Sequence, residues 1–258
     1  MTNAPMGQLA ERLGAGETLF MSWCGFNDPA VAEATARAGF DATLIDMQHG
    51  AVDYTSTVLG VGLVGLAGKP ALVRIPVGDF ALCSRLLDAG AAGVVAPMIN
   101  SVDEARRFAA HAKFPPAGER SWSPHRALAL SGRNAAAYLA DANALHMAFA
   151  MIETRAALAA LDDILDVEGV DGVLVGPADL SIALSGGASM NPTSDDVEAA
   201  LDHVAQRAAA KGKVAAVFCP TGARAHALAH RGFRLLAVAT DGLMLQAGAR
   251  IELKAAKG

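Results

Sequence analysis

Short apolar runs alternate eight times with segments of helical composition along this chain of 258 residues. A short continuous apolar run bounded by turn residues is typical of a strand that is buried on both faces. Strands that alternate with helices build parallel βαβ units. Eight such units in succession, with short connections and no low-complexity linker, favour one closed (β/α)₈ TIM barrel over an open sheet. We therefore expect residues 1–258 to form a single α/β domain.

The expected elements follow from these runs and from helix start and stop signals. The strands are expected at Thr18–Trp23, Ala42–Met47, Ala71–Ile75, Gly93–Met98, Met147–Ile152, Val170–Val175, Val214–Phe218 and Leu235–Ala239. The helices between and after them are expected at Pro29–Ala38, Tyr54–Leu66, Phe80–Ala89, Val102–Lys113, Arg155–Leu165, Asp195–Lys211, Gly222–Arg231 and Gly242–Ala256. Two further helices are expected at Gln8–Leu13 and Asn134–Ala142.

Composition limits the classes of partner and compartment. Hydrophobic residues make up 53% of the chain and aromatic residues only 5%, which predicts an Ala/Leu/Val core. A formal net charge of −5 without a basic block gives no electrostatic reason to bind nucleic acid or an anionic membrane. The longest apolar run, around Val58–Gly68, is too short to span a bilayer, and the N-terminus lacks a secretion signal. Cys24, Cys83 and Cys219 are expected to be reduced core thiols, and the cytoplasm is the expected compartment.

The stretch from His146 to Ser181 contains two apolar runs that each lead to a carboxylate. The first run closes on Glu153 and the second on Asp179, with a helical segment between them. Parallel strands end on one face of the sheet, so the two carboxylates are expected to lie side by side at its carboxyl end. Converging carboxylates repel unless they bind a divalent cation or share acid/base work.

Polar residues also follow the other expected strands. They are Trp23, Asp46, Gln48, His49, Arg74, Asn100, Thr240 and Asp241. No lysine lies at the carboxyl end of an expected strand, so a Schiff-base mechanism has no candidate. A carbonyl substrate would therefore have to be polarised by a metal ion and an arginine.

These residues suit one kind of chemistry. Glu153 and Asp179 offer hard oxygen ligands for an ion such as Mg²⁺ or Mn²⁺. Arg74 offers a fixed cation for a carboxylate or a developing enolate, although it could instead pair with a core carboxylate. His49 could be oriented by Asp46 and act as a general base. Such a set suits the making and breaking of a carbon–carbon bond next to a 2-oxo acid.

Several motifs, in this order and spacing, resemble the HpcH/HpaI aldolase family. They are LIDMQHG, LVRIP, LLDAGAAGVVAPM, FPPAGERS, MIETRAAL, VEGVDGVLVGPADLS and AVATD. The chain is most similar to the metal-dependent class II 2-oxo acid aldolases of the 4-hydroxy-2-oxoheptanedioate aldolase type. The likeness runs from about Leu19 to Asp241. It implies cleavage of a 4-hydroxy-2-oxo acid into pyruvate and an aldehyde, the reverse addition, and a role in aromatic catabolism.

The resemblance also implies roles for individual residues. Glu153 and Asp179 would bind the divalent metal, which would be Mg²⁺ or Mn²⁺, with Co²⁺ or Zn²⁺ as alternatives. His49, in the motif that also holds Asp46, would serve in the base that takes the 4-hydroxyl proton. Arg74 would stabilise the enolate. Asp88 matches an aspartate that raises the basicity of this histidine, including from a neighbouring subunit.

The remaining expectations concern the substrate pocket and assembly. The backbone of Gly176, Pro177 and Ala178 would bind the pyruvate carboxylate, and Trp23 could contact substrate or merely pack at the barrel mouth. The resemblance implies hexamers built as trimers of dimers, in which Gly242–Ala256 is exchanged between subunits. Within the long connection Phe114–Gly132, we expect Pro115–Gly132 to control aldehyde selectivity. The candidate residues in this connection are Arg120, Trp122, His125 and Arg126.

The chain departs from the family pattern at two positions. Gln48 stands where an acid commonly precedes the histidine, and Met151 stands where a substrate-binding glutamine is frequent. Both departures concern the distal half of the substrate, and Met151 makes the site less polar. Two rival functions remain open: an acyl-CoA lyase of the citrate lyase beta or malyl-CoA lyase type, and a barrel that binds oxo acids without turnover.

Three other patterns predict no site. Gly60, Gly62 and Gly65 spell GxGxxG, but no long strand precedes them, so a dinucleotide site is not expected. His226 and His230 share a helix face without a third ligand, and a surface role is expected for them. The three cysteines lack metal-ligand spacing.

Overall fold

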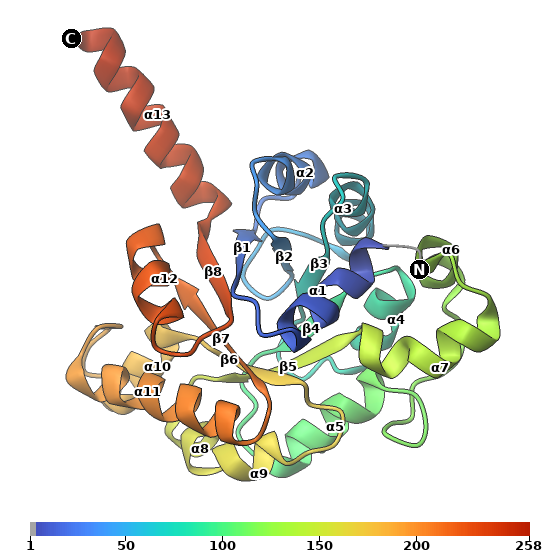
Figure 1. The fold of residues 1–258 in the computed structure, drawn as a ribbon. Coiled ribbons are helices and arrows are strands. Elements are labelled where there is room, and N and C mark those ends of the chain that lie inside the picture. Colours follow the sequence, from blue (N-terminus) through green and yellow to red (C-terminus); the bar gives the residue numbers. More distant parts are fainter. Residues whose placement is uncertain (1–3) are drawn as a thin grey trace.

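Eight parallel strands close into a barrel in the computed structural model, which describes residues 4–258 (Figure 1). The strands are β1 (Leu19–Cys24), β2 (Ala42–Asp46), β3 (Ala71–Arg74), β4 (Gly93–Ala96), β5 (Met147–Ile152), β6 (Gly172–Val175), β7 (Val214–Cys219) and β8 (Leu235–Thr240). They pair in sequence order, and β8 pairs with β1 to close the ring. The predicted (β/α)₈ barrel is therefore confirmed.

Helices connect the strands and pack around the ring. They are α1 (Pro5–Gly14), α2 (Pro29–Arg37), α3 (Tyr54–Leu66), α4 (Ala81–Asp88), α5 (Val102–Ala112), α6 (His125–Ser131), α7 (Ala135–Leu145), α8 (Arg155–Ala159), α9 (Leu161–Leu165), α10 (Pro177–Leu184), α11 (Asp195–Ala210), α12 (Gly222–Ala229) and α13 (Asp241–Lys257). The expected helix Arg155–Leu165 is divided at Ala160 into α8 and α9. Helices α6 and α10 were not expected. Helix α10 begins with Pro177 at its first position, where the fixed φ of proline suits a helix start.

The strand alternation divides the core into two layers. Every second strand residue, such as Leu44, Leu72, Phe149 and Leu174, belongs to one buried cluster inside the barrel. The intervening residues, such as Ile45, belong to a second cluster between the strands and the surrounding helices. Apolar residues of α1 and α7 join the inner cluster. Inward-facing residues recur every second position along a strand. The next inward-facing residue after the last apolar one, toward the carboxyl end, therefore points into the mouth of the barrel.

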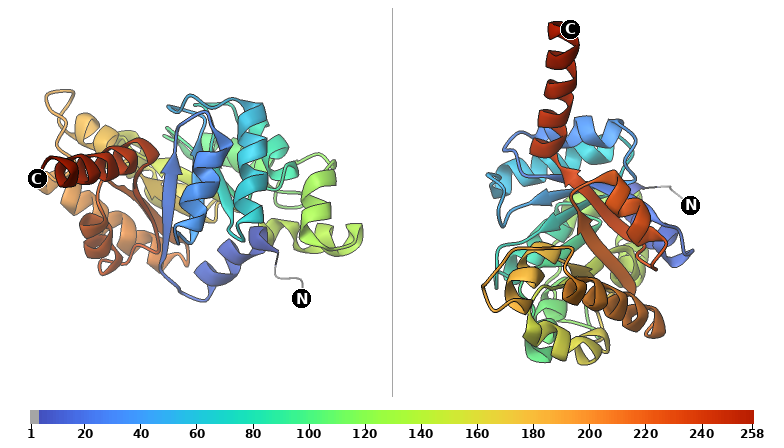
Figure 2. Two further views of the ribbon diagram at one scale, coloured as in Figure 1. Left: turned by 90° about the horizontal axis from the view of Figure 1, so that it is seen from above. Right: turned by 90° about the vertical axis from the view of Figure 1, so that its left-hand side faces the viewer.

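Helix α13 leaves the barrel and extends away from it (Figures 1 and 2). Its direction is set where it begins, because Asp241 Oδ2 accepts hydrogen bonds of 2.8 Å from the amides of Gly25 and Phe26. Thr240 caps the helix by accepting from Leu243 N. Leu243, Leu245, Ile251 and Leu253 of this helix are exposed.

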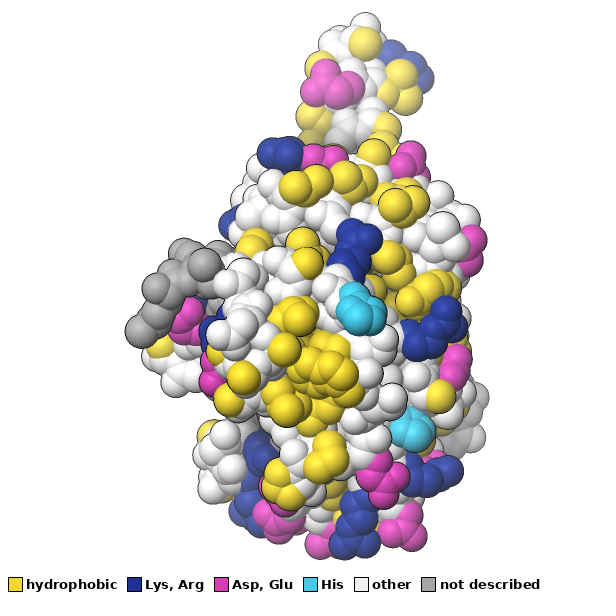
Figure 3. Space-filling view, turned by 90° about the vertical axis from the view of Figure 1, so that its right-hand side faces the viewer, with side chains coloured by type: hydrophobic (Ala, Val, Ile, Leu, Met, Phe, Trp, Pro, Cys, Tyr) yellow, Lys and Arg dark blue, Asp and Glu magenta, His cyan; other side chains and the backbone are white. Residues whose placement is uncertain are grey.

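The outer surface is mixed in character. Figure 3 shows hydrophobic side chains gathered at the centre of the face that includes α6, with charged groups around them. Exposed Leu66 and Leu130 line a groove between α3 and α6. Among residues 4–258 no helix is both long and apolar enough to cross a membrane.

Candidate active site

A cavity of about 240 Å³ lies at the carboxyl end of the barrel and collects most of the predicted site residues. It is lined by Trp23, Asp46, His49, Arg74, Met151, Gly176, Pro177, Ala178, Asp179, Phe218 and Thr240. Asp46, Arg74 and Met151 continue the inward series of their strands by two residues from Leu44, Leu72 and Phe149. Phe218 was not predicted, because an aromatic residue near the end of an apolar run cannot be told from core by sequence.

Arg74 and Asp46 form a buried, two-bond ion pair on adjacent strands. Arg74 Nε donates to Asp46 Oδ1 at 2.8 Å and Nη2 donates to Oδ2 at 2.6 Å. Trp23 Nε1 also donates to Oδ2 at 3.1 Å, and the guanidinium lies 4.7 Å from the Trp23 ring centroid. Burial alone would raise the pKa of Asp46, but the hydrogen bonds and charge of Arg74 hold this pKa below its ordinary value. The pair is therefore a fixed, ionised unit.

The expectation that Asp46 orients the His49 imidazole is wrong in this structure. Asp46 Oδ1 instead accepts hydrogen bonds from the backbone amides of Gln48, at 3.0 Å, and His49, at 3.3 Å. Both carboxylate oxygens are already engaged by Arg74, so little acceptor capacity remains for the ring. Asp46 thus shapes the turn that carries His49, whose side chain is exposed at the mouth.

Among residues 4–258, no oxygen acceptor is bound to the Nη1 edge of the Arg74 guanidinium. Its Nη1 atom lies 4.0 Å from the sulfur of Met151, and a thioether is a weak acceptor. Met151 is buried and also reaches toward Gly176, where an added Cβ would lie 3.2 Å from the Met151 methyl. The Nη1 edge of Arg74 is consequently available to an oxygen of a bound ligand.

Glu153 is a buried carboxylate that is held by the backbone. Its Oε1 atom accepts a 2.7 Å hydrogen bond from Met98 N, and Met98 has a left-handed φ of 55°. Its Oε2 atom lies beside Gly176, where an added Cβ would come within 2.7 Å. Burial raises the pKa of Glu153, and the negative charge of Asp179 adds to the rise, against the Met98 hydrogen bond.

Glu153 and Asp179 fit a divalent cation. They are two hard oxygen donors whose charges repel each other. Asp179 lines the cavity, and the buried Glu153 has its Oε2 atom against Gly176 of the cavity lining. A cation would relieve both the repulsion and the cost of burial. Within residues 4–258 no group of three or more Asp, Glu, His or Cys side chains could hold a metal ion. An ion held by this pair would keep its other coordination positions for substrate and water.

The start of α10 supplies backbone donors at the same place. Gly176 is the N-cap residue, and no side chain caps the helix. The first amides of a helix have no intrahelical partner and favour an anion. Because Gly176, Pro177 and Ala178 line the cavity, the helix start is placed to receive a substrate carboxylate.

Asp88 and the long connection lie at the other end of the barrel. Asp88 ends α4, just before β4 begins, and it is bound by Arg120 Nη2 at 2.6 Å. Arg120 is buried over the Phe114 ring, so it does not face the cavity. The Pro115–Gly132 segment lies away from the cavity of its own chain, because α5 returns the chain to the amino end of the barrel. Its control of aldehyde selectivity stays a prediction and would require the segment of a neighbouring subunit. A role for Asp88 toward a histidine of another subunit stays a prediction.

The other sequence patterns have structural explanations. Gly60 lies in α3 against Ile45, where a Cβ would come within 2.8 Å of the isoleucine Cδ1, and Gly62 lies against Arg126. His226 and His230 are both exposed, with ring centroids 4.7 Å apart. The three cysteines are free and buried, as predicted, and burial raises their pKa values.

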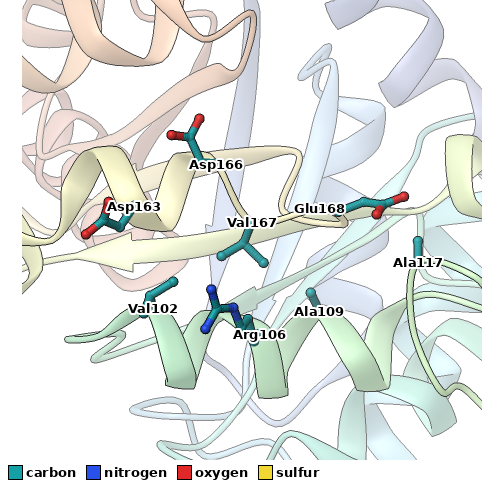
Figure 4. Close-up of a pocket in the computed structure, with 8 residues that line it drawn as sticks. All are labelled: Val102, Arg106, Ala109, Ala117, Asp163, Asp166, Val167 and Glu168. Atoms are coloured by element: carbon teal, nitrogen blue, oxygen red, sulfur yellow. The ribbon is translucent and has the colours of Figure 1, made fainter.

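A second cavity, of about 580 Å³, lies between α5 and the segment that ends α9 (Figure 4). Its charged lining consists of Arg106, Asp163, Asp166 and Glu168. None of the predicted site residues lies in it, and its acidic groups are on the outer layer of helices. The barrel mouth is therefore the better candidate for chemistry.

Comparisons with known proteins agree with the geometry. The family described as HpcH/HpaI aldolase/citrate lyase matches residues 19–247. The chain is 39% identical over 235 residues to a hydroxypyruvate/pyruvate aldolase of Rhizorhabdus wittichii, covering 91% of this chain and 92% of the relative. It is 36% identical over 241 residues to a 4-hydroxy-2-oxo-heptane-1,7-dioate aldolase of Salmonella dublin, covering 93% and 90%. The crystal structure of an HpcH/HpaI aldolase from Desulfitobacterium hafniense matches with a TM-score of 0.88 and 30% identity, covering 96% of each chain.

Proposed function

The chain belongs to the HpcH/HpaI aldolase/citrate lyase family, and we propose that it is a divalent-metal-dependent class II aldolase. It would cleave a 4-hydroxy-2-oxo acid into pyruvate and an aldehyde and catalyse the reverse addition. The observation that carries this proposal is that two arrangements meet at one cavity. The Arg74–Asp46 pair on β2 and β3 lines this cavity together with Asp179, which follows β6. Glu153, which follows β5, lies against Gly176, a residue of the cavity lining.

Glu153 and Asp179 would hold the metal. Hard carboxylate oxygens suit Mg²⁺ or Mn²⁺, and Co²⁺ or Zn²⁺ are alternatives. When bound, the ion would act as a Lewis acid toward the oxygens of the 2-oxo acid. The Met98 amide fixes one oxygen of Glu153, so the carboxylate is already oriented before the ion arrives.

Arg74 and the α10 helix start would bind the pyruvate half. The amides of Ala178 and Asp179 would receive the substrate carboxylate, since they lack intrahelical partners and Pro177 has no N–H. Arg74 Nη1 would donate to the oxygen on which enolate charge develops. Asp46 and Trp23 keep the guanidinium in one orientation, so no reorganisation is needed when the charge appears.

His49 would move the proton. In cleavage it would take the proton of the 4-hydroxyl group while the bond between C3 and C4 breaks. The electron pair of that bond then remains on the pyruvate half as an enolate, and the aldehyde leaves. The enolate becomes pyruvate when its C3 atom takes a proton. In the addition direction the same imidazolium would return the proton to the new alkoxide. The exposed position of His49 at the mouth suits a group that must exchange protons with solvent.

Release of pyruvate from a 4-hydroxy-2-oxo acid, followed through a lactate dehydrogenase coupling reaction, tests the proposal. We expect activity to vanish after treatment with a chelator and to return with Mg²⁺ or Mn²⁺. Glu153→Gln should abolish the return, whereas Glu119→Gln, at an exposed position, should behave like the parent protein. Pyruvate release that survives complete chelation would rule out the metal mechanism, and release from citramalyl-CoA instead would favour the acyl-CoA lyase.

We also propose that α13 packs on another copy of the chain. The support is the extension of the helix away from its own barrel and its exposed leucine and isoleucine side chains. Light scattering of Leu245→Glu combined with Ile251→Glu should give a smaller assembly than the parent protein. The variant Glu252→Gln, on the same helix, should leave the assembly unchanged.

A further inference from the structure

The turn that carries His49 is held by backbone contacts at both of its ends. At the first end, Asp46 Oδ1 accepts hydrogen bonds from the amides of Gln48 and His49. At the other end, Ala51 N donates a 2.8 Å hydrogen bond to the carbonyl of Gly25, in the loop after β1. In the part of the chain that the structure describes, the imidazole of His49 has no hydrogen-bond partner. Inside one chain, the backbone of this turn therefore determines where the ring lies.

The turn and the loop after β1 also pack backbone against backbone. A Cβ added at Gly50 would lie 2.9 Å from Gly25 Cα, which is closer than side chains tolerate. A Cβ added at Gly25 would lie 3.4 Å from Gly50 Cα. Two glycines thus allow the two segments to approach each other closely. A movement of the loop after β1 would consequently displace the residue that directly follows His49.

The loop after β1 is itself fixed by Asp241, the first residue of α13. The Asp241 carboxylate is buried and accepts three hydrogen bonds of 2.8 Å, all from backbone amides. Two of the donors are Gly25 and Phe26 in the loop, and the third is Gly242 in α13. Hydrogen bonds to an ionised acceptor are stronger than those between neutral groups. Asp241 therefore anchors the loop against which the His49 turn packs.

We propose that Asp241 is a positioning residue for His49. The contacts run from its carboxylate through Gly25 to Ala51, two residues beyond His49. The inference rests on the proposed aldolase function, in which His49 takes the 4-hydroxyl proton, and it adds a residue that acts on this base from the end of β8. A general base must lie within hydrogen-bond reach of the proton, and a displacement of about 1 Å can cost about 100-fold in rate.

Cleavage of a 4-hydroxy-2-oxo acid by Asp241→Ala measures the effect. We expect kcat to fall by about tenfold and KM to stay within about twofold, because substrate binds before the base acts. Ala51→Pro should lower kcat similarly, since proline lacks the N–H that bonds the Gly25 carbonyl. Asp196→Asn, at an exposed position, is the control and should keep the parent kcat. The Mn²⁺ affinity, measured by calorimetry, should equal that of the parent in all three variants.

The same substitution in a His49→Ala background shows whether Asp241 acts through the base. Single-turnover reactions with enzyme in excess can follow the slow cleavage by these proteins. Adding Asp241→Ala to His49→Ala should change the rate by less than about twofold, because no base is left to misplace. A role in stability alone would lower the rate by the same factor in both backgrounds.

Parent kcat in Asp241→Ala or in Ala51→Pro would overturn the inference, as would an equal loss in the His49→Ala background or a weaker Mn²⁺ affinity. A smaller assembly of Asp241→Ala in light scattering would also overturn it, because lost contacts between subunits would then explain the lower kcat. All these results leave the aldolase proposal standing, whereas an inactive parent protein overturns both. If Asp241→Ala does not fold, Ala51→Pro alone and combined with His49→Ala decides the matter.

Discussion

Arg74 and Asp46 are joined by two hydrogen bonds, of 2.8 and 2.6 Å, across adjacent strands and are almost fully shielded from water. The arrangement matches the planar guanidinium fork to the two carboxylate oxygens. It leaves one nitrogen of the fork for substrate. Pairing with Asp46 therefore holds the Arg74 guanidinium in one orientation, with Nη1 as the hydrogen-bond donor.

Arg74→Lys should lower kcat/KM for pyruvate release by about 100-fold, because an ammonium cannot make both bonds and also reach substrate. The free energy of unfolding should fall by about 2 kcal/mol, since the ammonium keeps the charge but replaces only one of the two hydrogen bonds to the buried Asp46. Steady-state kinetics and urea unfolding measure both effects. Arg85→Lys, an exposed arginine over the Tyr54 ring, is the matched control and should change neither quantity by much. Full activity in Arg74→Lys would contradict the role of the fork.

Gly176→Ala should weaken binding of Mn²⁺ by roughly 10- to 100-fold. The reason is that the new methyl group would come within 2.7 Å of Glu153 Oε2 and displace the carboxylate. Calorimetric titration of the variant with Mn²⁺ measures the loss. Gly248→Ala offers the control, because within residues 4–258 an added Cβ there would meet no atom within 4 Å outside its chain neighbours and the backbone of its own helix. Unchanged Mn²⁺ affinity in Gly176→Ala would mean that Glu153 does not ligate the ion.

His146 should make the protein less stable in acid. Burial, aided by the positive charge of Arg120, lowers the pKa of His146 from 6.5 to about 3. Between these two values the unfolded chain binds one more proton than the folded protein. Stability should therefore fall by about 1.4 kcal/mol for each pH unit as the pH drops below 6.5.

The change in this slope is the quantity to measure. Urea unfolding at several pH values should show a shallower dependence in His146→Gln, even if that variant is less stable throughout. The ring nitrogens of His146 contact the carbonyl of Ala91 and the hydroxyl of Tyr138, at 2.8 and 2.7 Å. His125→Gln, at an exposed histidine, should keep the parent slope. An identical slope in both variants would assign the acid sensitivity to other groups.

Asp241→Ala should lower the free energy of unfolding by about 2–3 kcal/mol, because the amides of Gly25 and Phe26 would lose a charged acceptor. Hydrogen exchange at these two amides should become faster, since they close the loop after β1 onto β8. Asp196→Asn, at an exposed position, should leave both measurements unchanged. Protection of the two amides in Asp241→Ala would show that another group holds the loop.

The strand positions could be predicted because buried parallel strands are continuous apolar runs. Met147–Ile152 was predicted to the residue, since a histidine and a glutamate bound it. The sixth strand begins at Gly172 instead of Val170, because the Val170 amide closes a turn onto Val167 and Asp171 pairs with Lys113. Such contacts between distant residues are invisible to a local pattern.

The site was predictable wherever a polar residue interrupts an apolar run, as at Asp46, Arg74 and Glu153. The hydrogen-bond partners within the site could not be predicted, because they depend on the three-dimensional positions of individual atoms. The ring of His49 and the carboxylate of Asp46 are three residues apart, yet Asp46 binds the backbone of the turn. The sequence around Phe218 does not indicate a site residue, since only the closed barrel shows that its side chain faces the cavity.

The hydrogen bond that orients Glu153 comes from the main chain of Met98, and this has a consequence for how the site can vary in evolution. A side-chain donor can be deleted by a single base change, but an amide N–H survives every replacement except proline. Residue 98 is therefore free to drift among side chains that tolerate a φ of 55°, glycine foremost, while the carboxylate keeps its setting. The hydrogen bond that orients Glu153 is therefore retained as long as the backbone conformation at residue 98 is retained.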